Sequence, residues 1–384
     1  MSSSPFLPPS RRRRSRRRRR EPARRRAHGR REPARGRRRA GRSVTALFVA
    51  LGFVVVAVVL VLTRPWSTHA VAAPPRAHKG APALAGGGIP ASARSAGPLS
   101  PIGLTLGRPP LALDLGDRAA DPLHLRFPEA PRAGLLVDLD SGRVLWQRNP
   151  LARVRIASLT KMMTALLTVK AAPASAHVPI TKQAEATSGS KVGVLPLGRH
   201  VRLESLLYGL LLPSGNDAAV ALAQHVAGTV HRFVEEMNAE AARLGMGCTR
   251  YSSPSGYYNT HNYSCAADLA ELAREDLRQP RIAHITRTRA AILRFPVKGG
   301  KLYLYNNNPL LVYGYPGVTG LKTGYTIEAG RCLVATAERH GVHLAVVLLH
   351  SPAPGVQARD LLDDAFEHIY HQRPVHEPPM PADA

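Results

Sequence analysis

The chain of 384 residues is long enough for one large domain or two medium-sized ones. Its formal net charge of +27 is misleading as an average, because 19 arginines and only two acidic residues fall within residues 1–43.

Three cysteines without a Cys-x-x-Cys pair exclude a disulfide framework, and 16 histidines without a His-Glu-x-x-His pattern disfavour a zinc peptidase. We expect no metal and no other cofactor. A Cys248–Cys265 bridge is conceivable, but small buried side chains are the simpler interpretation.

Residues 1–43 form an arginine-rich tail with almost nothing apolar to bury, so we expect this tail to be disordered. Clustered arginines neutralise phosphates. However, no aromatic residues lie between these arginines, and no nucleic-acid-binding fold follows them. Specific binding to nucleic acid is therefore disfavoured.

Residues 44–62 are 19 consecutive uncharged residues, VTALFVALGFVVVAVVLVL, bounded by Arg42 and Arg64. A helix of this length spans about 28 Å, near the thickness of a bilayer core. The arginine excess before the segment predicts a cytoplasmic N-terminus and an exported remainder. We favour an uncleaved transmembrane helix, with a signal peptide cleaved near Ala70-Val71-Ala72 as the alternative.

Residues 63–127 are rich in Pro, Gly and Ala, which is typical of an extracytoplasmic linker. We expect order to begin near Pro128 and to continue to residue 373. Residues 374–384 would then be a short tail.

The hydrophobic pattern after Pro128 predicts strands at both ends of the domain and helices between them. Expected strands are Leu135–Leu139 and Arg143–Gln147, which flank the turn Asp140-Ser141-Gly142, and later Gly317–Thr326, Arg331–Ala337 and Val342–His350. Expected helices begin near Ser158 and then cover Leu203–Leu212, Asp217–Gly228, Val230–Leu244, Ala266–Leu277 (started by Ser264) and Asp360–Tyr370. The fold class is therefore α+β, with an antiparallel sheet joined by the N- and C-terminal parts, flanking helices and a helical insert.

A first short motif, Ser158-Leu159-Thr160-Lys161, lies at the start of the first predicted helix. A helix places residues i and i+3 on one face, so Ser158 and Lys161 can touch. Lysine can activate a serine hydroxyl only as a neutral amine, which requires a pKa well below about 10.4. Burial lowers a lysine pKa, and a second cation nearby, such as Lys322, lowers it further.

A second motif, Ser214-Gly215-Asn216, follows an apolar helix and Pro213, so we expect a loop with exposed side chains. A second hydroxyl, that of Ser214, can relay a proton to a leaving amine. The Asn216 amide can donate to a substrate carbonyl and orient Lys161. Asn216 or Asp217 can also cap the helix that follows.

A third motif, Lys322-Thr323-Gly324, places a cation and a hydroxyl on a predicted strand with glycines beside them. Glycine lets a substrate backbone approach the strand edge closely. Lys322 and Thr323 suit a C-terminal carboxylate.

These motifs, in this order, resemble those of the low-molecular-mass penicillin-binding proteins, the serine-type D-alanyl-D-alanine carboxypeptidases of peptidase family S11. The similar stretches are Ala157–Thr164, Leu210–Ala219, Asn306–Leu311, Gly317–Thr326 and Ala329–Leu333. The resemblance extends over roughly residues 128–373 and implies a β-lactamase/DD-peptidase-like fold. It also implies a peptidoglycan stem peptide as substrate and β-lactam antibiotics as ligands. With the apolar segment, it implies a single-pass protein of the bacterial cell membrane whose catalytic domain is extracytoplasmic.

The resemblance assigns roles residue by residue. It implies catalytic roles for Ser158, Lys161 and Ser214, and substrate-binding roles for Asn216, Lys322, Thr323, Gly324 and Tyr325. Ser158 would be the acylated nucleophile and Lys161 its base. The oxyanion hole would be formed by the backbone N–H groups of Ser158 and Tyr325.

Two features depart from the family pattern. Many members carry a C-terminal β domain and an amphipathic anchoring helix, whereas about a dozen residues follow Tyr370 here. The N-terminal segment would then provide the membrane attachment. In addition, Pro254-Ser255-Gly256-Tyr257 stands where the family more often has a His-Gly-Leu-like stretch, so the substrate preference stays open.

Three alternatives remain. A class A β-lactamase shares the motifs but needs a carboxylate in an exposed catalytic loop, and the available stretch, Glu235-Glu236-Met237-Asn238, falls in the middle of an amphipathic helix. Gly215 stands where that class usually has Asp. A D-Ala endopeptidase acting on crosslinks is chemically closer, and a non-catalytic wall-binding protein that kept the fold is a third possibility.

Overall fold

A computed structural model describes residues 111–116, 120–257, 261–375 and 379–384. The predicted arginine-rich tail, the apolar segment 44–62 and most of the predicted linker lie outside the described residues. Within the described part of the chain, no helix is both long and apolar enough to cross a membrane.

A five-stranded antiparallel sheet lies at the centre of the fold, with the strand order β2-β1-β11-β10-β9. Its strands are β1 (Ala133–Asp138), β2 (Val144–Arg148), β9 (Val318–Thr326), β10 (Gly330–Arg339) and β11 (Val342–Ser351). The predicted hairpin at residues 135–147 is β1–β2, and β1 pairs with β11 from the other end of the domain. The prediction of an antiparallel sheet joined by the N- and C-terminal parts is therefore confirmed.

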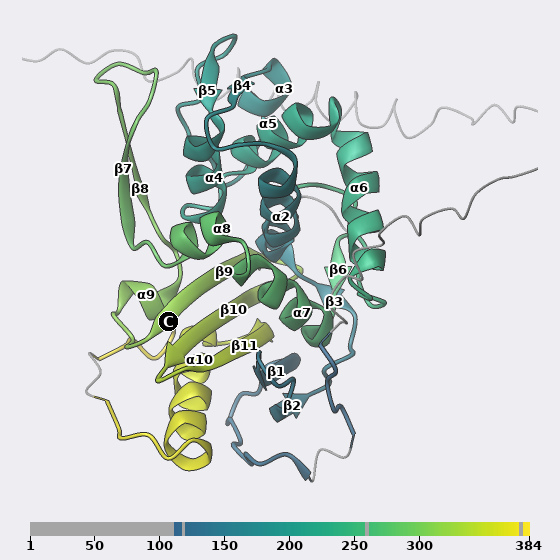
Figure 1. The fold of residues 1–384 in the computed structure, drawn as a ribbon, viewed down its shortest axis with the longest axis vertical. Helices are drawn as coiled ribbons and strands as arrows, with labels where there is room; N and C mark the ends of the chain where they lie inside the picture. The colour runs from purple at the N-terminus through teal and green to yellow at the C-terminus, as the bar shows by residue number, and fades with distance from the viewer. Residues whose placement is uncertain (1–110, 117–119, 258–260, 376–378) are drawn as a thin grey trace, which may run out of the picture. The chain divides into compact units, whose positions relative to one another are not determined.

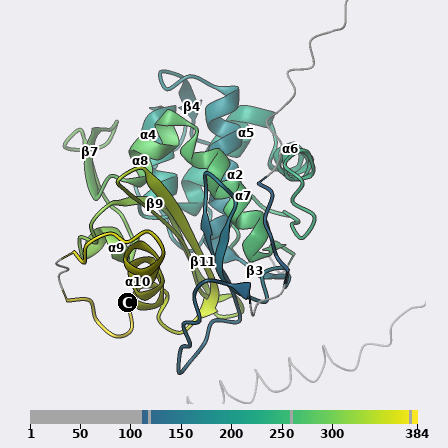
Figure 2. The ribbon, with the colours of Figure 1, turned by 60° about the horizontal axis from the view of Figure 1, so that its bottom comes forward.

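The sheet is buried on both faces, which explains the continuous apolar run of β11. Side chains alternate across a strand, so Val347 joins one core cluster and its neighbour Val346 joins the other. The first cluster includes residues of α2, α4, α5 and α7, and the second includes Leu361 and Phe366 near the C-terminus. Figures 1 and 2 show α10 on one side of the sheet and the helical group on the other.

The described residues form the six predicted helices and three short helices that the sequence did not predict. They are α2 (Lys161–Ala171), α3 (Lys182–Glu185), α4 (Leu203–Leu211), α5 (Asn216–Ala227), α6 (Val230–Arg243), α7 (Ala266–Leu277), α8 (Pro280–Thr286), α9 (Pro309–Val312) and α10 (Pro354–Asp364). Two details of the prediction were wrong. The N-cap residue of α7 is Cys265 rather than Ser264. The last helix begins at Pro354 rather than Asp360, because proline suits the first turn of a helix, and it ends in a π-helical turn at Ala365–Ile369.

The sequence did not predict three short strand pairs. They are β3 (Val154–Arg155) with β6 (Tyr263–Ser264), β4 (His177–Pro179) with β5 (His200–Arg202), and β7 (Ala290–Arg294) with β8 (Lys301–Tyr305). Most of these strands have only two or three residues, too few for an alternating pattern to stand out.

Ordered packing begins before Pro128, earlier than the sequence predicted. Asp121 accepts hydrogen bonds from the backbone N–H and the side-chain amide of Gln147, at 3.1 and 2.8 Å. Trp146 Nε1 donates to the carbonyl of Leu125 at 3.1 Å. The last part of the predicted linker therefore packs along β2, through polar contacts that composition does not reveal.

Candidate active site

Ser158 lies in a 3₁₀ turn, Ala157–Thr160, that runs directly into α2. The three-residue spacing places Lys161 on the same face, and Lys161 Nζ lies 2.8 Å from Ser158 Oγ. Ser158 is half-buried, whereas the side chain of Lys161 is fully buried. The contact expected from the sequence is therefore present.

The Lys161 amine has three neighbours, and their chemistry fits a neutral amine. Two of them, Asn216 Oδ1 at 2.8 Å and the carbonyl oxygen of Ser255 at 2.9 Å, can only accept hydrogen bonds. The third, the Ser158 hydroxyl, can donate. A neutral amine has two N–H groups for the two carbonyl oxygens and one lone pair for the Ser158 proton. The arrangement thus prepares Lys161 to take up that proton.

The electrostatic surroundings favour the same protonation state. Burial holds the pKa of Lys161 well below its ordinary value, the charge of Lys322 lowers it further, and Asp217 opposes the shift. Lys322 is also buried, and this burial lowers its pKa to about 7. Its Nζ donates to the carbonyl of Thr323 at 2.9 Å. Two buried lysines with lowered pKa values, one of them in contact with a serine hydroxyl, are unusual for a purely structural core.

The second motif follows α4 and runs into α5. Its side chains are buried, so the exposed side chains predicted from the sequence were wrong. Ser214 has a left-handed backbone conformation with φ of 68°, which is uncommon for a residue other than glycine. Its hydroxyl is buried, and no described residue forms a hydrogen bond with it. The hydrogen-bonding capacity of Ser214 Oγ is therefore unused within the described part of the chain. Strain combined with an unpaired polar group is a combination found at functional sites.

Asn216 and Asp217 begin α5, and both form hydrogen bonds with the loop between α3 and β5. The N-cap residue is Gly215, so neither of them is the N-cap that the sequence suggested. The Asn216 amide donates to the Ser188 carbonyl at 2.8 Å while its oxygen faces Lys161. Asp217 accepts from the backbone N–H groups of Val192 and Gly193, at 2.9 and 3.1 Å.

The third motif lies on β9, which is an edge strand because it pairs only with β10 in the central sheet. Gly324 faces the 3₁₀ turn so closely that a Cβ atom there would lie 2.8 Å from the Ile156 carbonyl and 3.2 Å from the Ser158 nitrogen. Thr323 is half-buried and Tyr325 is 65% exposed. An extended peptide can therefore approach the edge of β9 beside Ser158.

The structure thus brings the predicted residues together to different degrees. Direct contacts join Ser158, Lys161 and Asn216, and Gly324 packs against the same turn. Lys322 acts on Lys161 through its charge. Among the described residues, no hydrogen bond connects the side chains of Ser214, Thr323 or Tyr325 to Ser158 or Lys161.

The sequence did not predict that the residues after Arg250 form part of the site. Besides the Ser255 carbonyl on Lys161, the Pro254 carbonyl accepts a hydrogen bond from Thr164 Oγ1 at 2.7 Å. Gly256, with φ of 74°, leaves no room for a side chain, because a Cβ atom would lie 1.9 Å from the Ala157 carbonyl. Backbone carbonyls leave no signal in a sequence. The one clue was that Pro254–Tyr257 departs from the family pattern.

The stretch Glu235–Asn238 lies within α6, as predicted, and the carboxylates of Glu235 and Glu236 are exposed. Glu235 pairs with His231 on the same helix. No described contact links either carboxylate to Ser158 or Lys161. A β-lactamase-type catalytic carboxylate is therefore not provided by this stretch.

Comparison with known proteins gives relatives that are named D-alanyl-D-alanine carboxypeptidases or endopeptidases. The chain is 34% identical over 253 residues to D-alanyl-D-alanine carboxypeptidase DacF of Bacillus subtilis, covering 64% of this chain and 64% of the relative. It is 35% identical over 249 residues to D-alanyl-D-alanine carboxypeptidase DacB2 of Mycobacterium tuberculosis, covering 62% and 84%. It is 30% identical over 226 residues to the D-alanyl-D-alanine endopeptidase of Escherichia coli, covering 57% and 71%. The matched part thus spans less than two thirds of the length of the Bacillus relative.

Solved structures agree with these relatives. The crystal structure of the Streptomyces K15 DD-transpeptidase is 31% identical, with a TM-score of 0.59, and the match covers 63% of this chain and 99% of that one. DacD from Francisella tularensis is 26% identical, with a TM-score of 0.59, and the match covers 65% and 73%. The sequence profile described as D-alanyl-D-alanine carboxypeptidase matches residues 128–353, which is more than half of the chain. The chain therefore belongs to the D-alanyl-D-alanine carboxypeptidase family, peptidase family S11.

Proposed function

We propose that this chain is a penicillin-sensitive serine D-Ala-D-Ala carboxypeptidase that removes the terminal D-alanine from peptidoglycan stem peptides through an acyl-enzyme. The observation that carries the proposal is the set of contacts of Lys161. Its amine lies 2.8 Å from Ser158 Oγ, while two carbonyl oxygens occupy its N–H groups. A solvent-exposed lysine on a helix would not have these three contacts.

Acylation follows from these positions. Ser158 Oγ attacks the carbonyl carbon of the penultimate D-alanine, and its proton passes to Lys161. The oxyanion that forms lies between the backbone N–H groups of Ser158 and Tyr325. The C–N bond then breaks as the departing amine takes a proton from Ser214, whose hydroxyl has no partner among the described residues. The proton that Lys161 took from Ser158 passes to Ser214 in its place, so both groups return to their starting states.

Substrate orientation uses the edge of β9. Lys322, charged, attracts the terminal carboxylate, and Thr323 and the Gly324–Tyr325 backbone lie beside it along the strand. A β-lactam antibiotic carries an equivalent carboxylate and acylates the same serine. Water finally hydrolyses the ester on Ser158 and regenerates the enzyme.

Endopeptidase activity on crosslinks is the second candidate. It is supported by relatives named D-alanyl-D-alanine endopeptidase, from Pseudomonas aeruginosa at 34% identity and from Escherichia coli at 30%. The chemistry is the same, and only the leaving group differs. Release of D-alanine from a pentapeptide, compared with cleavage of a crosslinked dimer, separates the two activities.

We also propose that residues 44–62 anchor the protein in the bacterial cell membrane, with the N-terminus in the cytoplasm and the catalytic domain outside. The support is the uncharged 19-residue stretch and the arginine excess before it. A reporter fused after Ala384 should be active only outside the cytoplasm. Activity inside would reject this topology.

The test of the enzymatic proposal is the intact mass of the full-length chain after brief mixing with benzylpenicillin. We expect one covalent adduct per chain, mapped to Ser158, and D-alanine release from a pentapeptide ending in D-Ala-D-Ala. Ser158→Ala should abolish both while leaving the melting temperature unchanged. Consumption of the drug without an adduct would instead indicate a β-lactamase, and no reaction at all would indicate a non-catalytic protein.

A further inference from the structure

Cys248 and Cys265 lie at the two ends of the segment that contains Pro254 and Ser255, whose carbonyls contact the first helix of the site. This segment begins after α6 and ends at the start of α7. Within it, the Ser255 carbonyl accepts from Lys161 Nζ at 2.9 Å and the Pro254 carbonyl accepts from Thr164 at 2.7 Å. The position of this segment therefore fixes one of the three contacts of the Lys161 amine.

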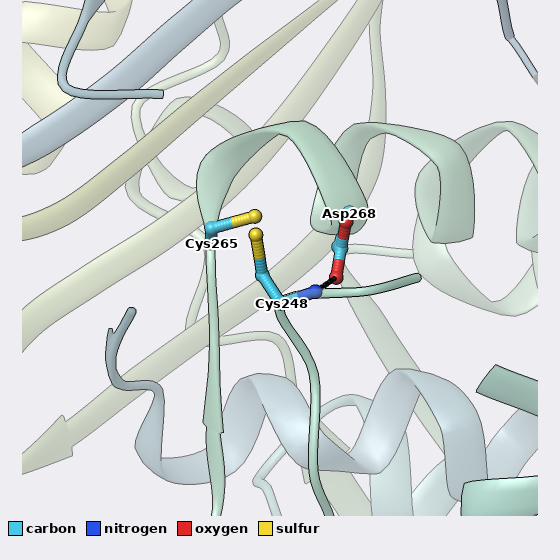
Figure 3. A group of neighbouring side chains, drawn as sticks. All are labelled: Cys248, Cys265 and Asp268. Carbon is cyan, nitrogen blue, oxygen red and sulfur yellow. Dashed lines mark hydrogen bonds between the residues drawn. The ribbon is translucent and has the colours of Figure 1, made fainter. Parts of the chain in front are cut away.

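The ends of the segment run side by side. Arg250 and Tyr263 exchange two backbone hydrogen bonds, of 3.0 and 3.1 Å. The hydroxyls of Thr249 and Ser264 lie 2.7 Å apart. The next residues along the two ends are Cys248 and Cys265, whose sulfurs point toward each other (Figure 3). These sulfurs lie within 4.8 Å of each other and of an Asp268 carboxylate oxygen. The sequence had left a Cys248–Cys265 bridge as an alternative to the simpler interpretation of small buried side chains, and the structure brings the two sulfurs together.

The two thiols differ in access. Cys248 is partly exposed and Cys265 is fully buried, and both are free thiols in this structure. Burial raises the pKa of Cys265, and the hydrogen bond with Cys248 raises it further. Cys248 is therefore the thiol that meets a reagent first. The third cysteine, Cys332, is buried in β10 next to the Ala329 carbonyl and has no part in this pair.

A metal ion is the other occupant to consider. Asp268 would have to be its third ligand, but Asp268 Oδ2 already accepts from the backbone N–H of Cys248 at 2.8 Å and from Thr249 Oγ1 at 2.6 Å. These bonds explain the position of the carboxylate without an ion. They also hold Cys248 close to the N-terminus of α7, where Cys265 is the N-cap residue.

We propose that Cys248 and Cys265 form an intrachain disulfide that fastens the two ends of the segment and thereby positions the Ser255 carbonyl against Lys161. The Cys248 thiolate attacks a sulfur of a low-molecular-weight disulfide or of a thiol–disulfide oxidoreductase, and this oxidant releases one thiolate. Cys265, on losing its proton, attacks Cys248 Sγ in the mixed disulfide, so the intrachain S–S bond forms and the second thiolate leaves. Two electrons pass to the oxidant, and the two protons lost by the cysteines convert its thiolates into thiols.

The first test maps the bond. The full-length chain is purified from bacterial envelopes, denatured with an alkylating reagent present, and digested with trypsin without reductant. We expect a linked pair of peptides, one with Cys248 and one with Cys265, while the peptide with Cys332 is alkylated. Alkylation of all three cysteines would overturn the proposal. So would one equivalent of bound zinc whose removal by a chelator exposes the two thiols.

The second test measures positioning, and this part rests on the proposed acylation of Ser158. Reduction of the disulfide, or the double substitution Cys248→Ser with Cys265→Ser, should lower the limiting rate of acylation by benzylpenicillin roughly tenfold. The concentration for half-maximal rate should stay the same, because Lys322 and Thr323 are not moved. The final adduct should still reach one per chain, which separates slower chemistry from loss of folded protein.

Cys332→Ala is the matched control, and its acylation rate should still fall on reduction and recover on reoxidation. Equal limiting rates for the oxidised and reduced chains would overturn the positioning role, even if the linked peptides are found. If the oxidised chain forms no adduct at all, the proposed enzymatic function fails, while peptide mapping still decides whether the disulfide exists.

Discussion

Lys161 and Lys322 are both buried, and the charge of Lys322 lowers the pKa of Lys161. The two side chains come from α2 and β9, which are far apart in the sequence. Their proposed roles need opposite protonation states, since Lys161 must be neutral to accept a proton and Lys322 must be charged to bind a carboxylate. The close approach of the two lysines serves both needs, because a charge on one disfavours a charge on the other.

This relationship predicts a descending alkaline limb in the pH profile. Burial lowers the pKa of Lys322 to about 7. The second-order rate of acylation by benzylpenicillin should therefore fall as the pH rises through about 7, where Lys322 loses its proton. It should also fall toward acid pH, as Lys161 gains a proton. The measurement is the acylation rate of the full-length chain from about pH 5 to about pH 9.

Lys322→Arg is the matched variant for this profile, because an arginine keeps its charge over the whole range. Its maximal rate is expected to be lower, but the alkaline limb should disappear. A wild-type profile that stays flat above pH 7 would show that the charge of Lys322 is not required.

Lys161→Ala should lower the acylation rate by a factor on the order of 10²–10⁴, the usual contribution of a general base. The reason is that Ser158 would lose the only amine within hydrogen-bonding distance among the described residues. The control is Lys170→Ala on the same helix, where the lysine is partly exposed and pairs with Glu240. If Lys161→Ala is acylated as fast as this control, the base must be another group.

Gly324→Ala should separate β9 from the turn that carries Ser158. The added Cβ would lie 2.8 Å from the Ile156 carbonyl, so the strand must shift. We expect acylation to slow by roughly 10²-fold, the usual consequence of displacing a reacting group by about 1 Å. The control is Gly247→Ala, because that position is exposed and has no atom within 4 Å of the added Cβ. An unchanged rate in Gly324→Ala would mean that this close approach does not matter for acylation.

Asp276→Asn should stabilise the protein at neutral pH. Asp276 is fully buried, neither carboxylate oxygen has a hydrogen-bond partner among the described residues, and burial holds its pKa well above the usual range. The folded state therefore binds this proton more tightly than the unfolded state, and stability falls as the pH rises above the unfolded pKa of about 3.9. Asn carries no ionisable carboxyl and escapes this cost, so Asp276→Asn should raise the unfolding free energy at pH 7.

The stabilisation by Asp276→Asn should shrink as the pH is lowered toward 4, because the wild-type carboxyl then becomes increasingly protonated in the unfolded state as well. Melting temperatures at a series of pH values measure this effect. Asp114→Asn, at an exposed position, serves as the control and should change little. A difference that is independent of pH would show that Asp276 does not carry the predicted shift.

Local patterns in the sequence predicted much of the fold. The bounds of α4, α5, α6 and α7 were predicted within one or two residues, because each helix has its own apolar face and its own end signals. The hairpin β1–β2 and the adjacent strands β10 and β11 were also predicted, since tight turns separate them. The pair β3–β6 was missed, because its two strands lie more than 100 residues apart and have only two residues each.

The same division holds for the site. The sequence by itself determined that Ser158 and Lys161 share one helix face, because that contact depends only on helical geometry. Only the tertiary structure decided that the Ser255 carbonyl completes the surroundings of the Lys161 amine, that Gly324 presses against the Ser158 turn, and that the sulfurs of Cys248 and Cys265 meet. Each of these contacts joins segments from different elements. Such contacts depend on how helices and strands pack together, and that packing is set by the combined burial of many residues rather than by the pattern of any one segment.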